Sequence, residues 1–182
     1  KSTVRKATSI FVFTPQMKQY AQKMGADPNK IEAFASGVGD EIFDVASNGL
    51  NMRKTLSINE DEWVVFFMGW LYKFSGMREI VKEIAETPDI LDSARLLIVG
   101  DGDIYQELKD LVKKHQLAPK VLMTGKRPYK EIPALLGTAN VCLMPALEND
   151  ITRDIVPMKV YEYLACGRPL VASSLPGMVA EF

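Results

Sequence analysis

Short, continuous apolar runs alternate with amphipathic segments along most of the chain. Apolar runs bounded by Gly, Pro and polar residues predict buried strands, and apolar residues spaced three and four apart predict helices between them. The predicted strands are residues 9–14, 31–35, 64–68, 95–99, 121–124, 140–144 and 170–172, and the predicted helices are residues 15–25, 77–86, 104–115 and 130–137. This alternation predicts an α/β fold, with a Rossmann-like parallel sheet and helices on both of its faces.

A further helix is predicted around Glu162, and Gly167 and Pro169 would end it. Its apolar face would be Met158, Tyr161, Leu164 and Ala165, and its polar side would be Lys159, Glu162 and Cys166. A lysine and a glutamate one turn apart usually mark a solvated helix face. The pair alone therefore indicates no function.

Composition narrows the class of protein. The length of 182 residues predicts one domain, or one domain with part of another. The 22 basic and 23 acidic residues nearly cancel, which argues against nucleic-acid binding driven by net charge. Cys142 and Cys166 lie in apolar surroundings, so we expect reduced thiols and a cytoplasmic protein. No apolar run approaches the roughly 18 residues of a membrane span. A chain that opens without methionine leaves open a signal segment removed earlier.

Four loops with polar or charged residues follow predicted strands at their carboxyl ends. They are residues 69–76 (GWLYKFSG), 100–103 (GDGD), 125–129 (GKRPY) and 145–154 (PALENDITRD). In parallel sheets, ligands bind at this edge. Gly69 would allow the backbone to approach a phosphate, although the first loop could equally be a packed aromatic loop. Lys73, Lys126, Arg127 and Lys159 together would form a positive pocket suited to a diphosphate.

Two further motifs could carry chemistry, but each also has a structural explanation. Asp101 and Asp103 are spaced to hold a divalent cation, but Asp103 with Gln106 also resembles a capping box that begins the next helix. Tyr105 stands where a dinucleotide fingerprint needs its third glycine. His115 is the only histidine and follows two lysines, which suits the end of a helix. We therefore predict no metal site.

Five stretches, taken in order, resemble the donor-binding half of a GT-B-fold retaining glycosyltransferase of the group 1 family. This class includes sucrose-phosphate synthases and bacterial mannosyl- and glucosyltransferases. The stretches are SGVGDEIF (36–43), VVFFMGWLYKFSG (64–76), LLIVGDGD (96–103), VLMTGKRPYKEIPALLGTANVCLMPA (121–146) and KVYEYLACGRPLVASSLPGMVAEF (159–182). The resemblance implies that residues 1–45 end an acceptor domain and connect it to a donor-binding domain at 46–182, truncated at its C-terminus. We take residues 48–61, a polar stretch around a possible short helix at 49–56 (GLNMRKTL), as the linker.

The resemblance also implies an activity. The whole protein would transfer a sugar from a UDP- or GDP-linked donor to an acceptor hydroxyl with retention of configuration, in polysaccharide or glycolipid biosynthesis. Glu162 would accept hydrogen bonds from both ribose hydroxyls, and main-chain groups of Lys126, Arg127 and Pro128 would hold the base. The nucleotide sugar is a substrate, and neither a cofactor, an essential metal nor a protein nucleophile is implied. The acceptor, a glycan or lipid-linked sugar, would bind the missing domain, so peripheral membrane association stays open.

The chain departs from the family pattern at the diphosphate. The family commonly places an arginine after the first loop glycine and a lysine before the second. Trp70 and Ser75 stand there instead, and Lys73 is out of register. Lys73, Arg127 and Lys159 are the candidates to replace the missing charge.

Catalytic residues on the acceptor side would lie outside this chain, which we expect to bind donor and to catalyse nothing alone. Within it, Asp154 stands where the family often has a second glutamate, and Glu148 is a competing candidate. Two other functions compete with the transferase. One is a sugar-nucleotide epimerase of the same fold, and the other is a non-catalytic nucleotide-binding module, for which Trp70 and Ser75 are the best argument.

Overall fold

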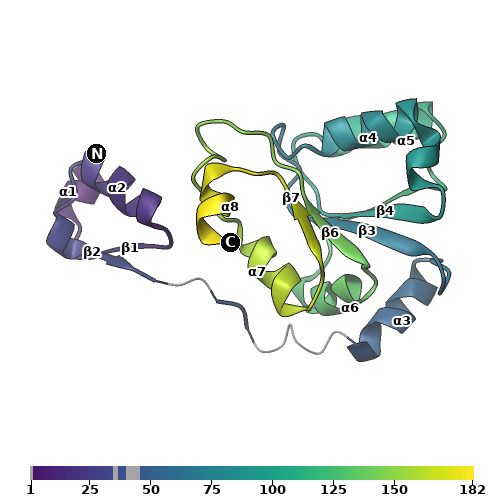
Figure 1. Ribbon diagram of the computed structural model, residues 1–182, viewed down its shortest axis with the longest axis horizontal. Helices are drawn as coiled ribbons and strands as arrows, with labels where there is room; N and C mark the ends of the chain where they lie inside the picture. The colour runs from purple at the N-terminus through teal and green to yellow at the C-terminus, as the bar shows by residue number, and fades with distance from the viewer. Residues whose placement is uncertain (1, 35–36, 40–45) are drawn as a thin grey trace. The chain divides into compact units, whose positions relative to one another are not determined.

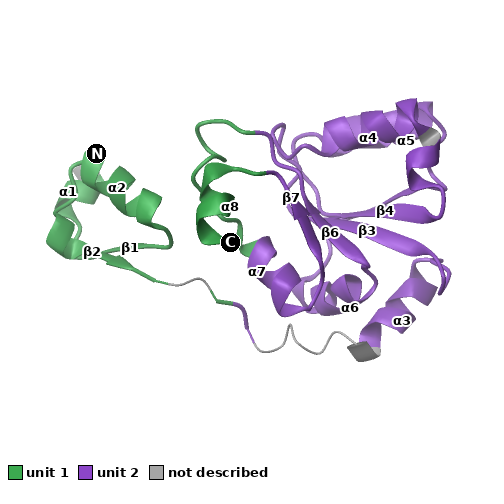
Figure 2. Cartoon of the chain, viewed as in Figure 1, with its two compact units in different colours: residues 1–37, 148–158, 174–182 green, residues 38–147, 159–173 purple. Residues whose placement is uncertain are grey.

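A computed structural model describes residues 2–34, 37–39 and 46–182 (Figure 1). The chain forms two compact units (Figure 2). Residues 38–147 and 159–173 make the larger unit, and residues 1–37, 148–158 and 174–182 make the smaller one. Only residues 37–39 of the predicted turn at 36–43 lie within the described part of the chain. The domain division expected at residue 45 stays a prediction. No helix in the described ranges combines the length and apolar character needed to cross a bilayer.

The larger unit contains a five-stranded, entirely parallel sheet, which confirms the predicted fold class. Its strands are β3 (Trp63–Met68), β4 (Ala94–Val99), β5 (Val121–Gly125), β6 (Val141–Met144) and β7 (Leu170–Ala172). The order across the sheet is β5-β4-β3-β6-β7. The chain therefore moves outward from β3 on one side and returns beside it with β6. In such sheets, the place where the direction reverses opens a crevice at the carboxyl ends of the strands.

Helices cover both faces of this sheet (Figure 1). They are α3 (Ala46–Thr55), α4 (Met77–Glu86), α5 (Tyr105–Lys114), α6 (Ile132–Gly137) and α7 (Met158–Ala165), with short 3-10 turns at Pro88–Leu91 (η3) and Tyr129–Glu131 (η4). Phe66 packs with Tyr163 and Leu135 on one face, whereas Phe67 packs with Met77 and Leu108 on the other. Successive strand residues point to opposite faces, so a strand covered on both sides must be apolar throughout.

The structure confirms the short helix predicted within residues 48–61 but corrects the prediction that this stretch is a linker. Residues 48–55 belong to α3, which packs against α6. Arg53 of α3 is buried and donates hydrogen bonds to the carbonyl oxygens of Glu62 at 2.8 Å and Thr138 at 2.7 Å. The polar composition of this segment misled the prediction, because one buried arginine attaches the helix firmly to the sheet.

The smaller unit contains two parallel strands, β1 (Ile10–Val12) and β2 (Ile31–Ala33), paired from Ile10 opposite Ile31. Its helices are α1 (Ser2–Lys6), α2 (Pro15–Lys23), the 3-10 turn η1 (Pro28–Lys30) and α8 (Pro176–Glu181). Thr14 caps α2 by accepting a hydrogen bond from the Met17 amide at 3.1 Å, and Pro15 opens the helix. The predicted strand–helix–strand order is confirmed, although both strands are shorter than predicted.

Candidate functional site: a pocket at the carboxyl ends of the strands

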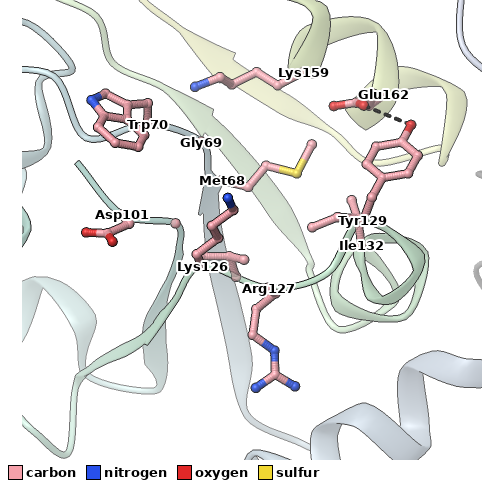
Figure 3. Close-up of a pocket in the computed structure, with 12 residues that line it drawn as sticks. Met68, Gly69, Trp70, Asp101, Lys126, Arg127, Tyr129, Ile132, Lys159 and Glu162 are labelled. Carbon is pink, nitrogen blue, oxygen red and sulfur yellow. Dashed lines mark hydrogen bonds between the residues drawn. The ribbon is translucent and has the colours of Figure 1, made fainter.

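A pocket of about 450 Å³ lies at the carboxyl ends of β3, β4 and β5, within the larger unit (Figure 3). Its lining residues are 68–70, 99–101, 126, 127, 129, 132, 159 and 162. Three of the four predicted loops supply part of this wall, and the rest comes from α7, from the first residue of α6 and from the ends of β3 and β4. The volume is within the range of small-molecule sites.

Two glycines, Gly69 and Gly100, bring backbone into the lining of the pocket. The Gly69 amide donates a hydrogen bond to the Val99 carbonyl at 2.9 Å, which joins the ends of β3 and β4. A Cβ atom on Gly100, whose φ is +145°, would overlap the Gly69 carbonyl oxygen. Only glycine therefore permits this approach, and it leaves main-chain groups accessible to a ligand.

Glu162 enters the pocket from α7. The Tyr129 hydroxyl donates a hydrogen bond to Glu162 Oε1 at 3.2 Å (Figure 3). The next residue, Tyr163, is fully buried, and its hydroxyl accepts a hydrogen bond from the Met68 amide at 2.9 Å. Tyr163 thus attaches α7 to the end of β3, and this attachment places Glu162 beside the pocket.

The predicted apolar face of this helix is wrong. Leu164 is 42% exposed and Met158 is 45% exposed, whereas Val160 and Tyr163 are fully buried. Both faces offered apolar residues at helical spacing, so the pattern could not distinguish them. The sequence did not predict that Tyr163 is buried, because a buried tyrosine hydroxyl needs a hydrogen-bond partner and the sequence does not reveal that partner.

Lys159, one turn before Glu162, carries the most perturbed charge in the pocket. Its Nζ lies 4.6 Å from the centre of the Phe67 ring, and a Cβ atom on Gly69 would clash with it. Burial lowers the pKa of Lys159 to about 8, although the nearby Glu162 carboxylate raises it. Among the described residues, no carboxylate forms an ion pair with Lys159.

The other three predicted cations are placed differently from one another. Lys126 lines the pocket and has no ion pair within the described ranges. Arg127 also lines the pocket, but its guanidinium forms an ion pair with Glu131 at 2.6 Å. Figure 3 shows the side chains of Lys126 and Arg127 pointing in opposite directions. Lys73 is exposed and does not line the pocket. The positive charge available here is therefore that of Lys126 and Lys159.

The GDGD loop does not begin α5 as predicted. Asp103 accepts a hydrogen bond from the Trp70 indole Nε1 at 3.1 Å, and Gln106 donates instead to Asp110 at 2.9 Å, so the capping box is wrong. Asp101 lines the pocket and accepts a hydrogen bond from the following amide at 2.8 Å. Within the described ranges, no three His, Cys, Asp or Glu residues gather closely enough to hold a metal ion.

Four residues outside the pocket behave as structural groups. Ser75, in the place of the family's lysine, is buried, and its hydroxyl has no hydrogen-bond partner among the described residues. His115 is exposed at the end of α5, as predicted. Cys142 and Cys166 are buried, and neither forms a disulfide. Burial raises the pKa of Cys142 to about 12 and that of Cys166 to about 11, so neither thiol is reactive near neutral pH.

The two candidates for catalysis belong to the smaller unit. The Arg153 guanidinium lies 3.9 Å from Glu148 and 4.0 Å from Asp154. Their roles stay predictions.

A five-stranded parallel sheet flanked by helices, with a ligand-sized pocket at its carboxyl edge, matches the domains of GT-B glycosyltransferases. The chain belongs to the family of group 1 glycosyl transferases, whose family model matches residues 50–182.

Three similar proteins illustrate the relationship. An uncharacterized glycosyltransferase of Methanocaldococcus jannaschii is 25% identical over 183 residues, covering 98% of this chain and 45% of the relative. The 2-deoxystreptamine glucosyltransferase of Streptomyces kanamyceticus is 25% identical over 178 residues, covering 96% of this chain and 45% of the relative. The crystal structure of Anabaena HepE in complex with UDP and glucose has a TM-score of 0.78 at 17% identity, covering 99% of this chain and 48% of HepE. The chain therefore spans less than half the length of these proteins.

Proposed function

We propose that the whole protein is a retaining glycosyltransferase, and that the pocket described above binds its UDP- or GDP-linked sugar donor. The observation that carries the proposal is the charge arrangement of the pocket in a group 1 family chain. The Glu162 carboxylate lines the same pocket as two ammonium groups, Lys126 and Lys159, that have no ion pair among the described residues. A donor of this class offers hydroxyls for the carboxylate and a diphosphate for the cations.

Each part of the donor has a chemical counterpart in the wall. Glu162 would accept hydrogen bonds from the ribose hydroxyls, and a charge-assisted bond of this kind contributes about 1.5–3 kcal/mol. Lys159 would pair with the diphosphate, which would offset the cost of its own burial. Main-chain groups of residues 126–128 would hold the base, because the Arg127 side chain is already engaged with Glu131.

In the proposed reaction, the bond between the sugar and the β-phosphate breaks and a bond to the acceptor oxygen forms on the same face. Lys126 and Lys159 would stabilise the charge that develops on the departing diphosphate. The departing phosphate oxygen would take the acceptor proton, so the chain needs no nucleophile of its own for this step. Retention of configuration is tested in the full-length protein by the anomeric configuration of the product, measured by NMR.

The first test of the proposal is a calorimetric titration of the 182-residue chain with UDP, GDP and ADP, and with UDP-glucose and GDP-mannose. We expect saturable binding of one base, and a loss of affinity of about 10- to 100-fold in Glu162→Ala. Glu107→Ala is the matched control, because Glu107 is a carboxylate paired with Arg78 and does not line the pocket.

Two results would count against the transferase. If no nucleotide binds, or if Glu162→Ala and Glu107→Ala bind equally well, the pocket is not the donor site. If the full-length protein binds UDP or GDP tightly without turning over any nucleotide sugar, the non-catalytic module is the better description. Trp70 and Ser75, in place of the family's cationic pair, are the feature that favours that second function.

A further inference from the structure

Trp70 is held in a fixed orientation at the rim of the pocket although half of it is exposed. Its accessible fraction is 50%, and it lines the pocket beside Gly69. The indole N–H is fixed by Asp103 at 3.1 Å. On its other side, the Tyr72 ring lies 6.3 Å away at 51°, and Tyr72 in turn stacks on Phe74 at 4.8 Å and 11°. Two neighbouring aromatic rings and one hydrogen bond therefore orient a side chain that is half exposed.

The chemistry that Trp70 offers to a ligand is that of a ring face. Tryptophan has one hydrogen-bond donor and no acceptor, and Asp103 already accepts that donor. A diphosphate would therefore find no free donor on this side chain. The remaining surface is an apolar ring with a negative face, which attracts weakly positive C–H groups.

The position of Trp70 relative to the other pocket residues suggests which part of a ligand it meets. Figure 3 shows Trp70 and Glu162 on opposite sides of Lys159. A nucleotide sugar has a fixed order of base, ribose, diphosphate and sugar. With the ribose at Glu162 and the diphosphate at Lys159, an assignment that rests on the function proposed above, the next group in line is the sugar.

We infer that Trp70 is the surface on which a sugar ring stacks in this site. A pyranose presents C–H groups on its face and hydroxyls at its edge, so it can cover an aromatic ring without losing the hydration of its hydroxyls. Asp103 and Tyr72 set the angle of the platform. The stacked ring belongs either to the donor or to an acceptor glycan, and both have the same C–H face.

The inference is tested by comparing each nucleotide with its sugar derivative. We would measure dissociation constants of the 182-residue chain for UDP and UDP-glucose, and for GDP and GDP-mannose, by calorimetry. If the stacked ring is the donor's, we expect Trp70→Ala to weaken the binding of the nucleotide sugar about five- to tenfold and that of the free nucleotide less than about twofold. Glu162→Ala should weaken the binding of the nucleotide and of its sugar derivative by the same factor.

The two proposals fail in different ways. Nucleotide binding that depends on Glu162, with a loss of about five- to tenfold for both UDP and UDP-glucose in Trp70→Ala, would overturn the stacking role alone and would assign Trp70 to the nucleotide. If neither UDP nor GDP binds the unmodified chain, the donor site itself fails and the stacking role falls with it.

Fluorescence identifies the source of the stacked ring. The chain has two tryptophans, and Trp63 stands at the opposite end of β3 with a similar exposure of 56%. Trp63→Phe therefore leaves Trp70 as the sole reporter, and Trp70→Phe is the matched control with Trp63 alone. Quenching by UDP-glucose beyond that by UDP assigns the ring to the donor, whereas quenching by maltotriose with UDP present assigns it to an acceptor. Quenching by neither sugar would overturn the inference.

Asp103→Ala separates orientation from contact. Because Asp103 fixes the indole, Asp103→Ala should weaken the binding of UDP-glucose by about two- to threefold, which is less than the loss in Trp70→Ala. The affinity for UDP should stay unchanged. An unchanged affinity for UDP-glucose in Asp103→Ala would show that the indole needs no orientation by this hydrogen bond.

Discussion

The two ends of strand β3 treat positive charge in opposite ways. At the amino end, the Arg53 guanidinium is buried and donates hydrogen bonds to four carbonyl oxygens and to Asn140 Oδ1. At the carboxyl end, Lys159 and Lys126 line an open pocket without an ion pair from the described residues. The fold itself supplies the hydrogen-bond acceptors of Arg53. An anionic ligand would have to supply a partner for Lys126 and Lys159.

This difference shows that a cationic side chain can serve either stability or binding. A buried cation with several fixed acceptors holds its elements together, and its removal leaves those acceptors without a partner. A buried cation without an anionic partner weakens the fold until an anion arrives. Substitutions at the two ends should therefore have opposite effects on stability.

The largest effect is expected at the amino end. Arg53→Met should lower the free energy of unfolding by about 3 kcal/mol, because it removes the donor shared by α3 and the starts of β3 and β6. Urea denaturation measures this. Arg127→Met is the matched control, since its half-exposed pair with Glu131 should contribute less than about 1 kcal/mol. Equal losses in the two variants would show that Arg53 does not join these elements.

The sequence predicted the fold better than the site, for a physical reason. Burial on both faces leaves a continuous apolar run such as residues 64–68, and that signal depends only on the strand itself. Arg53 contacts Thr138, which is 85 positions away, and Asp103 contacts Trp70, which is 33 positions away. No local sequence pattern encodes such contacts. The resemblance led to Glu162 but missed Tyr129, whose hydroxyl meets Glu162 only because η4 and α7 lie side by side.

At the carboxyl end, Lys159→Met should change stability and binding in opposite directions. We expect nucleotide affinity at pH 7 to fall about tenfold, while the free energy of unfolding rises by about 1 kcal/mol, because methionine avoids the cost of burying a charge. The gain should shrink as the pH rises from about 8 to about 10.5, where the folded chain has lost the Lys159 proton and the unfolded chain keeps it. Calorimetry and urea denaturation measure the two effects. A loss of both stability and affinity would place Lys159 with Arg53, as a structural cation.

The lowered pKa of Lys159 also predicts a pH dependence of binding. A diphosphate binds the protonated form better, and the free chain loses that proton near pH 8. Affinity for UDP or GDP should therefore fall about fivefold from about pH 7.5 to about pH 9, while the phosphate charge, with an ionisation near pH 6, stays nearly constant. Titration calorimetry over this range, with Lys159→Met as control, measures it. The same slope in wild type and variant would assign the pH dependence to another group.

The smallest effect is expected at Tyr129, whose hydroxyl donates to Glu162 Oε1 across 3.2 Å on an exposed part of the pocket wall. Tyr129→Phe removes that hydrogen bond but keeps the ring, so it should weaken nucleotide binding by about twofold, because water can replace an exposed donor. In the Glu162→Ala background the same substitution should have no effect, since its partner is gone. A double-mutant cycle of the four dissociation constants measures this coupling. Additive losses would show that Tyr129 meets the ligand directly and does not act by orienting Glu162.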